Sequence, residues 1–193
     1  MRSQGQAEAS SRAGMFVAAL SGGIVAISFI AQATAFGPEA AAFALMVLPV
    51  ILFVGVTTFV RTLDLAADDV RWVRGLNRVR SGYLEIEPSA DNYLVTGRAD
   101  DPAGVLATLN PGRSAGSLYG IVTTPGVIAV VDSSVAAAIA ALVLSLLAPA
   151  AGIAGVLAIG AGAFLLVLGL QARYGGVVFG RAVPRAAPPV AEG

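Results

Sequence analysis

The sequence lacks three reactive residue types: it contains no cysteine, no histidine and no lysine, so all twelve of its cations are arginine. Without cysteine there is no disulfide and no thiol nucleophile. Without histidine and lysine there is no imidazole base, Schiff base, Cys/His zinc site or P-loop lysine. The sequence also has no nucleophile elbow, no glycine-rich phosphate loop and no run of metal ligands. We therefore expect a protein that is not an enzyme, with no catalytic residue, metal or cofactor.

Charge is also scarce, since only 12% of the 193 residues are charged while 56% are hydrophobic, and the mean hydropathy is +0.80. A soluble domain carries roughly twice that share of charge, about 25%. Twelve arginines balance twelve acids, so no net basicity indicates a nucleic-acid partner. The composition is that of a membrane protein whose first partner is the lipid bilayer.

Long charge-free runs predict four membrane spans. Residues 15–36 and 40–60 are uncharged, and a helix over the first run rises about 33 Å, enough for a hydrocarbon core of about 30 Å. Gly37, Pro38 and Glu39 should form the turn between these spans. The apolar block 119–172 is too long for one crossing and should fold back at 148–152, giving spans over 120–147 and 153–172. The sequence predicts an all-α membrane protein, a four-helix bundle of two transmembrane hairpins (15–60 and 119–172).

The two ends of the chain are polar or rich in proline and alanine. We expect residues 1–14 to be a flexible tail and residues 173–193 to be a disordered tail. A cleaved signal peptide is a rival interpretation of the first span, because Ala33-Thr34-Ala35 resembles a small-residue cleavage site. Against it, the charge-free run exceeds the usual 7–15 residues of such a peptide.

The arginines predict the orientation. Two precede the first span, seven lie between the second and third spans, three follow the fourth, and the two short hairpin loops have none. By the positive-inside rule, both termini and the segment 61–118, named the insert from here on, are cytoplasmic. The expected location is the plasma (inner) membrane, as a multi-pass protein.

The insert should be helical. Span two continues without proline as a stalk until Pro88, and an apolar stripe follows its helical spacing: Leu65, Trp72, Val73, Leu76, Val79 and Tyr83. Tyr93-Leu94-Val95 is expected to be a strand or a packed loop. Asp101 and Pro102 predict the start of a short helix that ends at 110–112. Val105, Leu106 and Leu109 should pack on the stalk's stripe and complete a small cytoplasmic cap.

Asp132 is the sharpest polar signal within the spans, because it falls near the middle of the third. A carboxylate there costs at least about 2.5–3.5 kcal/mol to insert, so such residues usually face a bundle interior or water. We group it with four neighbours into one candidate intramembrane site: Asp132, Ser133, Ser134, Thr123 and Thr124. Partners are expected among Ser21, Ser28, Gln32, Thr34, Thr57 and Thr58. The site is either a proton or cation site or a hydrogen bond that joins helices, and the second interpretation is favoured.

A cluster in the stalk is the other candidate, a possible anion or partner contact: Arg71, Arg74, Asn77 and Arg78. The alternative is intramolecular pairing of these arginines with nearby acids such as Asp68 or Asp100, and this is the favoured interpretation.

The motifs RxLDLAxxDxxWVxGxNRxRxxYLEIxP and YLVTGxxDD, over residues 61–88 and 93–101, resemble uncharacterised small four-span membrane proteins of high-GC actinobacteria. The resemblance implies an inner-membrane location and carries no ligand or functional residue. The leading functional expectation is a non-enzymatic membrane protein that acts through homo-oligomerisation or binding of another membrane protein at its insert. The alternative is a small oligomeric channel or proton/cation pathway that uses Asp132. A weaker third is a membrane effector whose oligomers permeabilise the bilayer.

Overall fold

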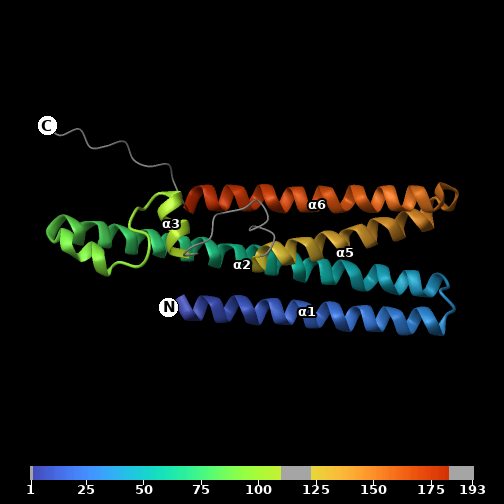
Figure 1. The fold of residues 1–193 in the computed structure, drawn as a ribbon. Helices are drawn as coiled ribbons and strands as arrows, with labels where there is room; N and C mark the ends of the chain where they lie inside the picture. The colour runs from blue at the N-terminus through green and yellow to red at the C-terminus, as the bar shows by residue number, and fades with distance from the viewer. Residues whose placement is uncertain (1, 110–122, 183–193) are drawn as a thin grey trace. The chain divides into compact units, whose positions relative to one another are not determined.

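The computed structural model describes residues 2–109 and 123–182. Every regular element within these two ranges is a helix, as Figure 1 shows. The elements are α1 (Arg2–Ala33), α2 (Pro38–Ile86), η1 (Pro88–Tyr93), α3 (Pro102–Leu109), α5 (Thr124–Leu147), η2 (Pro149–Ala151) and α6 (Gly152–Ala182). The all-helical class predicted from the sequence is therefore confirmed.

The chain divides into two compact units. Unit 1 comprises Met1–Leu63 and Gly120–Gly175, and unit 2 comprises Asp64–Tyr119 and Gly176–Gly193. Both α2 and α6 pass from one unit into the other, since each helix extends across a boundary between them. Unit 1 thus holds the predicted spans, and unit 2 holds most of the insert together with the end of α6.

In the part of the chain that the structure describes, four helices are long and apolar enough to cross a bilayer: Gln4–Ala33, Pro38–Ile86, Thr124–Leu147 and Pro149–Ala182. Their surfaces carry large apolar side chains that are open to the surroundings, among them Phe29, Phe53 and Leu165, each more than 60% exposed. A soluble protein rarely exposes so much contiguous apolar surface. Four apolar helices of this length with exposed apolar side chains suggest a membrane protein.

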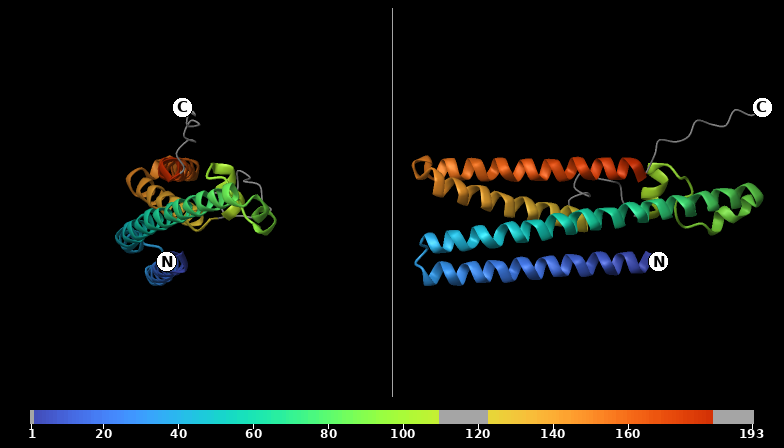
Figure 2. Two further views of the ribbon diagram at one scale, coloured as in Figure 1. Left: turned by 90° about the vertical axis from the view of Figure 1, so that its left-hand side faces the viewer. Right: turned by 180° about the vertical axis from the view of Figure 1, so that it is seen from behind.

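The first two helices of unit 1 lie side by side and are joined by a tight turn at residues 34–37 (Figure 2). Ala35 and Phe36 both adopt positive φ, and the Phe36 amide donates to the Ala31 carbonyl over 2.7 Å. Helix α2 begins at Pro38, where a missing N–H costs nothing. Glu39 was expected in the turn, but it lies in the first helical turn, where its charge suits the helix dipole.

The break predicted at 148–152 is present. The Ala148 amide closes α5 on the Leu144 carbonyl, and η2 follows at once. Gly152 adopts φ +64°, which disfavours any side chain, and begins α6. At the other end of α5, the Thr123 side chain accepts from the Gly126 amide as an N-cap, so this helix begins within the predicted third span.

Both predicted tails are wrong where the structure describes them. Residues 2–14 belong to α1, and residues 173–182 belong to α6, which ends at Ala182. Seven of the thirteen residues 2–14 are helix-forming alanine, glutamine or arginine, and Glu8 and Arg12 form an i,i+4 ion pair within this segment. In the second segment, Val178 and Phe179 pack on the core of unit 2, which stabilises the helix. The remaining predicted tail, 183–193, lies outside the described residues.

The insert follows the prediction closely along α2 and α3. Helix α2 continues to Ile86 and stops before Pro88. Asp101 caps α3 by accepting from the Gly104 amide over 2.7 Å, and Pro102 is the first helical residue. Between them, Tyr93 ends the 3-10 helix η1, and Tyr93 and Val95 are both highly exposed, so this piece is neither a strand nor a packed loop. The predicted end of α3 at 110–112 lies outside the described residues.

The core of unit 2 differs from the expected one. Its buried residues come from α2, α3 and the end of α6: Ala67, Val70, Val73, Val105 and Ala182, with Leu109, Val178 and Phe179 packed against them. Only Val73 of the predicted stripe belongs to this core. Trp72, Leu76, Val79 and Tyr83 are exposed instead, because α3 and α6 pack on a different face of α2.

Candidate functional site

Asp132 of α5 and Gln171 of α6 form a buried polar pair in unit 1. The Gln171 Nε2 atom donates a hydrogen bond to Asp132 Oδ2 over 3.0 Å. Asp132 is 0% exposed and Gln171 is 7% exposed. The pair therefore joins the two helices of the predicted second hairpin from within the protein rather than on its surface.

Gly55 of α2 lies directly against this pair. A Cβ atom at Gly55 would overlap Oδ1 of Asp132 and would come within 2.8 Å of both Asp132 Cγ and Phe16 Cε2. Phe16 of α1 is itself only 1% exposed. All four long helices thus contribute a residue at or next to Asp132, and only glycine leaves enough room on α2 for the carboxyl group.

Two oxygen atoms of the pair have no hydrogen-bond partner within the described part of the chain: Oδ1 of Asp132 and Oε1 of Gln171. Buried acceptors usually have a partner, and an unmet one costs about 1–3 kcal/mol. A proton on the carboxyl group, or a bound cation, would satisfy part of this unmet capacity. The arrangement thus has both a helix-joining contact and the oxygen atoms that a proton site needs.

The other predicted members of this site make contacts of their own, separate from the Asp132–Gln171 hydrogen bond. Ser133 is fully buried and donates to the Ala129 carbonyl, whereas Ser134 is exposed and donates to the Val130 carbonyl. Thr123 caps α5, and Thr124 is the first helical residue and is exposed. Eight to nine residues of helix, about 12–14 Å, separate these two threonines from Asp132, so they do not share its site.

The hydrogen-bond donor to Asp132 comes from α6, whereas partners were expected on α1 and α2. Expected partners lay on α1 and α2, but Ser28, Thr34, Thr57 and Thr58 each donate to a carbonyl of their own helix. Gln171 was missed because it falls at the very end of the predicted fourth span. The sequence signal for Gln171 is its amide side chain, which directly follows the apolar run 153–170.

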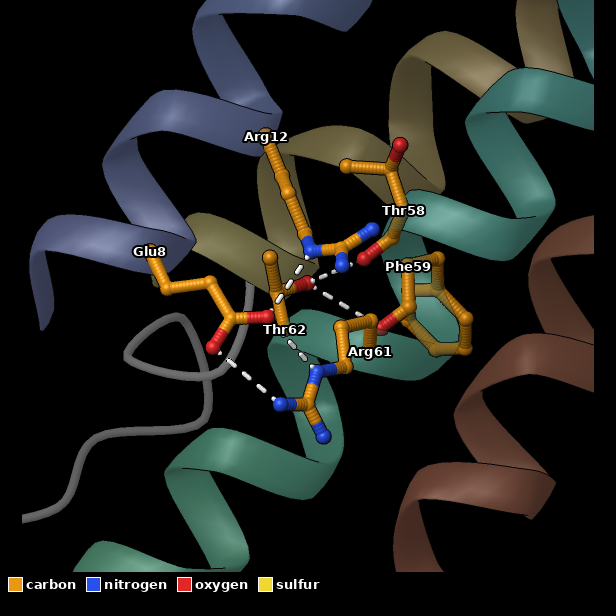
Figure 3. A network of polar contacts seen from close by, with 6 residues as sticks. All are labelled: Glu8, Arg12, Thr58, Phe59, Arg61 and Thr62. Carbon is orange, nitrogen blue, oxygen red and sulfur yellow. Dashed lines mark hydrogen bonds and ion pairs between the residues drawn. The ribbon is translucent and has the colours of Figure 1, made fainter. Parts of the chain in front are cut away.

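A second polar contact of unit 1 joins α1 to α2 (Figure 3). Glu8 of α1 accepts from Arg61 Nε over 2.9 Å and from Arg61 Nη2 over 3.1 Å, and Arg12 Nε donates to the same carboxylate over 3.0 Å. These groups follow the charge-free run of α2 and precede that of α1. They are partly exposed, so the contact adds little stability but marks one common end of the two apolar runs.

The predicted arginine cluster in unit 2 is engaged within the chain. Arg74 donates from Nε to the Asp100 carbonyl over 3.1 Å and from Nη1 to the Ala182 carbonyl over 3.0 Å. It therefore caps the last described turn of α6 while holding the loop before α3. Asn77 is fully buried and donates to the carbonyls of Ala99 and Gly104 over 2.8 and 3.3 Å.

The two outer arginines of the cluster pair with acids. Arg71 contacts Asp68 over 2.6 Å, and Arg78 Nε donates to Asp100 over 2.7 Å. A groove of about 440 Å³ beside them is lined by both signs of charge: Arg78, Ser81, Gly82, Glu85, Arg98, Ala99, Asp100 and Asp101. Three acids against two arginines do not favour an anion there. The arginines of the cluster therefore contact groups of their own chain, as the favoured interpretation of intramolecular pairing expects.

The exposed side of α2 in unit 2 is the least expected surface. Five large apolar side chains stand open along four turns of this helix: Trp72 (61% exposed), Leu76 (48%), Val79 (57%), Tyr83 (63%) and Ile86 (83%). Their spacing alternates between four and three residues, so all lie within about 80° of helix surface. These five residues are named the α2 stripe below. They lie in the charge-rich insert, beyond the charge-free run of α2.

Among the described residues, no group of three or more acidic, histidine or cysteine side chains could hold a metal ion. The chain matches no protein-family model, no curated protein and no solved structure.

Proposed function

We propose that this chain is a multi-pass protein of the plasma membrane that is not an enzyme and acts by assembly, with the α2 stripe of its insert as the binding surface. The observation that carries the proposal is the exposure of five large apolar side chains in a segment that is otherwise rich in charge. Contiguous apolar surface of this kind is typical of protein–protein contacts.

The proposal includes two hairpins of membrane spans and a cytoplasmic insert. The arginine count supports this orientation, because seven arginines lie between the second and third spans and none lies in the turns 37–39 and 148–152. Both termini are then cytoplasmic. Serine and threonine hydroxyls that donate to carbonyls of their own helix, as Ser28 and Thr58 do, fit a lipid environment, which offers no water to satisfy them.

The test is the molecular mass of the full-length protein extracted in mild detergent from the membrane in which it was made, measured by light scattering during size-exclusion chromatography. We expect the wild type to elute as a complex and the Leu76→Gln/Val79→Gln double variant to elute as a monomer. The control is Ser81→Gln, which changes an exposed residue on the opposite face of α2. A monomeric wild type would overturn the proposal.

A second candidate function is a proton pathway through Asp132. It is favoured by the two buried oxygen atoms without a partner, Asp132 Oδ1 and Gln171 Oε1. A protonated Asp132 has one O–H donor, and the unpartnered Gln171 Oε1 is an acceptor of the kind that such a donor requires, whereas metal cations such as Ca²⁺ take six to eight oxygen ligands. The test is proton and monovalent-cation flux into liposomes that carry the purified protein, with Asp132→Asn in parallel. Flux that the substitution abolishes supports this candidate, and no flux from folded, inserted wild-type protein excludes it.

A further inference from the structure

The α2 stripe has the residue spacing of a coiled-coil seam. The intervals from Trp72 to Ile86 are four, three, four and three residues, which is the alternation of d and a positions in a heptad repeat. Trp72, Val79 and Ile86 then occupy d, while Leu76 and Tyr83 occupy a. The stripe covers two heptads of a helix that is continuous from Pro38 to Ile86.

We propose that the occupant of the α2 stripe is the same stripe of a second copy of this chain, paired in parallel and in register. This inference rests on the proposed function and names its partner. In such a pair each stripe residue faces its own copy, so Leu76 contacts Leu76 of the partner subunit and Val79 contacts Val79 of the partner subunit.

Membrane insertion supports the parallel orientation. In copies inserted in one bilayer with the same topology, this segment of α2 leaves the membrane on the same side and runs in the same direction. Confinement to the bilayer also raises the effective concentration of one stripe for another. This matters because two heptads form a short seam, which would be marginal between free helices in water.

The residues beside the seam also permit a second copy. Gly75 and Gly82 occupy g positions, and a Cβ atom at either would meet nothing within 4 Å, so a partner helix has open space to approach. The parallel g–e′ pairs combine Asp68 with Val73, Gly75 with Arg80 and Gly82 with Glu87. Each pair contains at most one charge, so no like-charge contact opposes self-pairing.

The area is sufficient for a specific contact. Two aromatic and three aliphatic side chains from each copy bury on the order of 1,000 Å² in total, which is the lower limit for a specific interface. A heterologous partner would need a matching seam of its own. A second copy has that seam by symmetry, with the layers already aligned.

Cysteine cross-linking tests the inference directly because the wild-type chain contains no cysteine. Val79→Cys and Leu76→Cys place a thiol in two layers of the seam, and Ser81→Cys is the control, an isosteric change at an exposed position about 180° around α2. Each full-length variant is oxidised mildly in native membranes. We expect disulfide-linked dimers of Val79→Cys and Leu76→Cys to form at least about fivefold faster than those of Ser81→Cys.

Other outcomes separate the inference from the proposed function. A benzophenone maleimide on the Val79→Cys chain identifies whatever covers the stripe. If no disulfide dimers form and the adduct's added mass differs from that of this chain, a different protein covers the stripe. That outcome would overturn pairing with a second copy but would leave assembly at the stripe in place. Dimers only from a mixture of Trp72→Cys and Tyr83→Cys would overturn the parallel register. Neither dimers nor a protein adduct from folded protein would overturn both the inference and the proposed function.

Discussion

Gln171 donates to Asp132 across the contact between α6 and α5, over 3.0 Å and from within the protein. The two residues are 39 positions apart in the chain. Because both side chains are buried and the bond joins two helices, this contact helps to fix how α5 and α6 pack. Such interhelical bonds average about 0.6 kcal/mol and reach about 1.7 kcal/mol.

Replacing Gln171 by leucine should destabilise the protein by about 1–2 kcal/mol, because Asp132 then loses its donor and remains buried. The control is Ser134→Ala, which removes an exposed hydroxyl bonded to its own helix and should change stability by less than about 0.5 kcal/mol. Reversible unfolding in mild detergent measures both. Equal stability of the two variants would show that the hydrogen bond does not hold α5 and α6 together.

Gly55→Ala should be destabilising by about 1–3 kcal/mol, since the added Cβ overlaps Asp132 and crowds Phe16. The matched control is Gly22→Ala in α1, where a Cβ meets nothing within 4 Å and where alanine favours the helix by up to about 1 kcal/mol. The midpoints of thermal unfolding in the same detergent distinguish them. If Gly55→Ala is as stable as Gly22→Ala, the packing of α2 on Asp132 is contradicted.

Asn77→Ala should loosen the loop before α3, because the carbonyls of Ala99 and Gly104 lose their donor in a buried site. The expected cost is about 2–3 kcal/mol. Hydrogen exchange of the Gly104 and Val105 amides reports the loss of protection at this position. Arg71→Gln, which breaks only an exposed ion pair with Asp68, should leave these amides protected, and protection unchanged in Asn77→Ala would refute the role of Asn77.

Asp100 makes the insert sensitive to acid. The hydrogen bond from Arg78, aided by the charges of Arg78 and Arg74, holds the pKa of Asp100 below its usual value of 3.8. A lowered folded-state pKa stabilises the fold above the unfolded value, and this contribution is lost as the pH falls through the folded value. Arg78→Gln should raise the pKa of Asp100 toward 3.8 and remove that part of the acid sensitivity.

The measurement for Asp100 is a carboxyl-carbon NMR titration of the labelled protein, wild type beside Arg78→Gln. Arg71→Gln serves as the control because Arg71 pairs with Asp68 instead. The same titration midpoint in wild type and Arg78→Gln would contradict the contact.

Local rules accounted for much of the fold. Pro88 ended α2, Asp101 capped α3, and Gly152 followed the break after α5, because each acts on its own few residues. The long charge-free runs likewise identified the four apolar helices. The start of α1 was missed because its polar composition was given more weight than its local helix formers and the i,i+4 pair of Glu8 with Arg12. The end of α6 was missed because its helicity depends on packing against the core of unit 2, as at Phe179.

Only part of each candidate site could be predicted from the sequence. The burial of Asp132 follows from its position in a span, but Gln171 as its partner depends on how α5 and α6 are rotated against each other. Likewise, the apolar spacing on α2 predicted a packed stripe. Tertiary packing decides which face of α2 meets α3 and α6, and Trp72 lies on another face of the helix.

The most direct test of assembly at the α2 stripe uses Trp72, the sole tryptophan of the chain and a member of the stripe. Its emission and its quenching by acrylamide are recorded for the full-length protein in liposomes over a range of protein-to-lipid ratios. We expect the emission to shift to shorter wavelength and the quenching to fall as the ratio rises, with no such change in Leu76→Gln/Val79→Gln. Emission and quenching that stay constant over the whole range would contradict assembly at the α2 stripe.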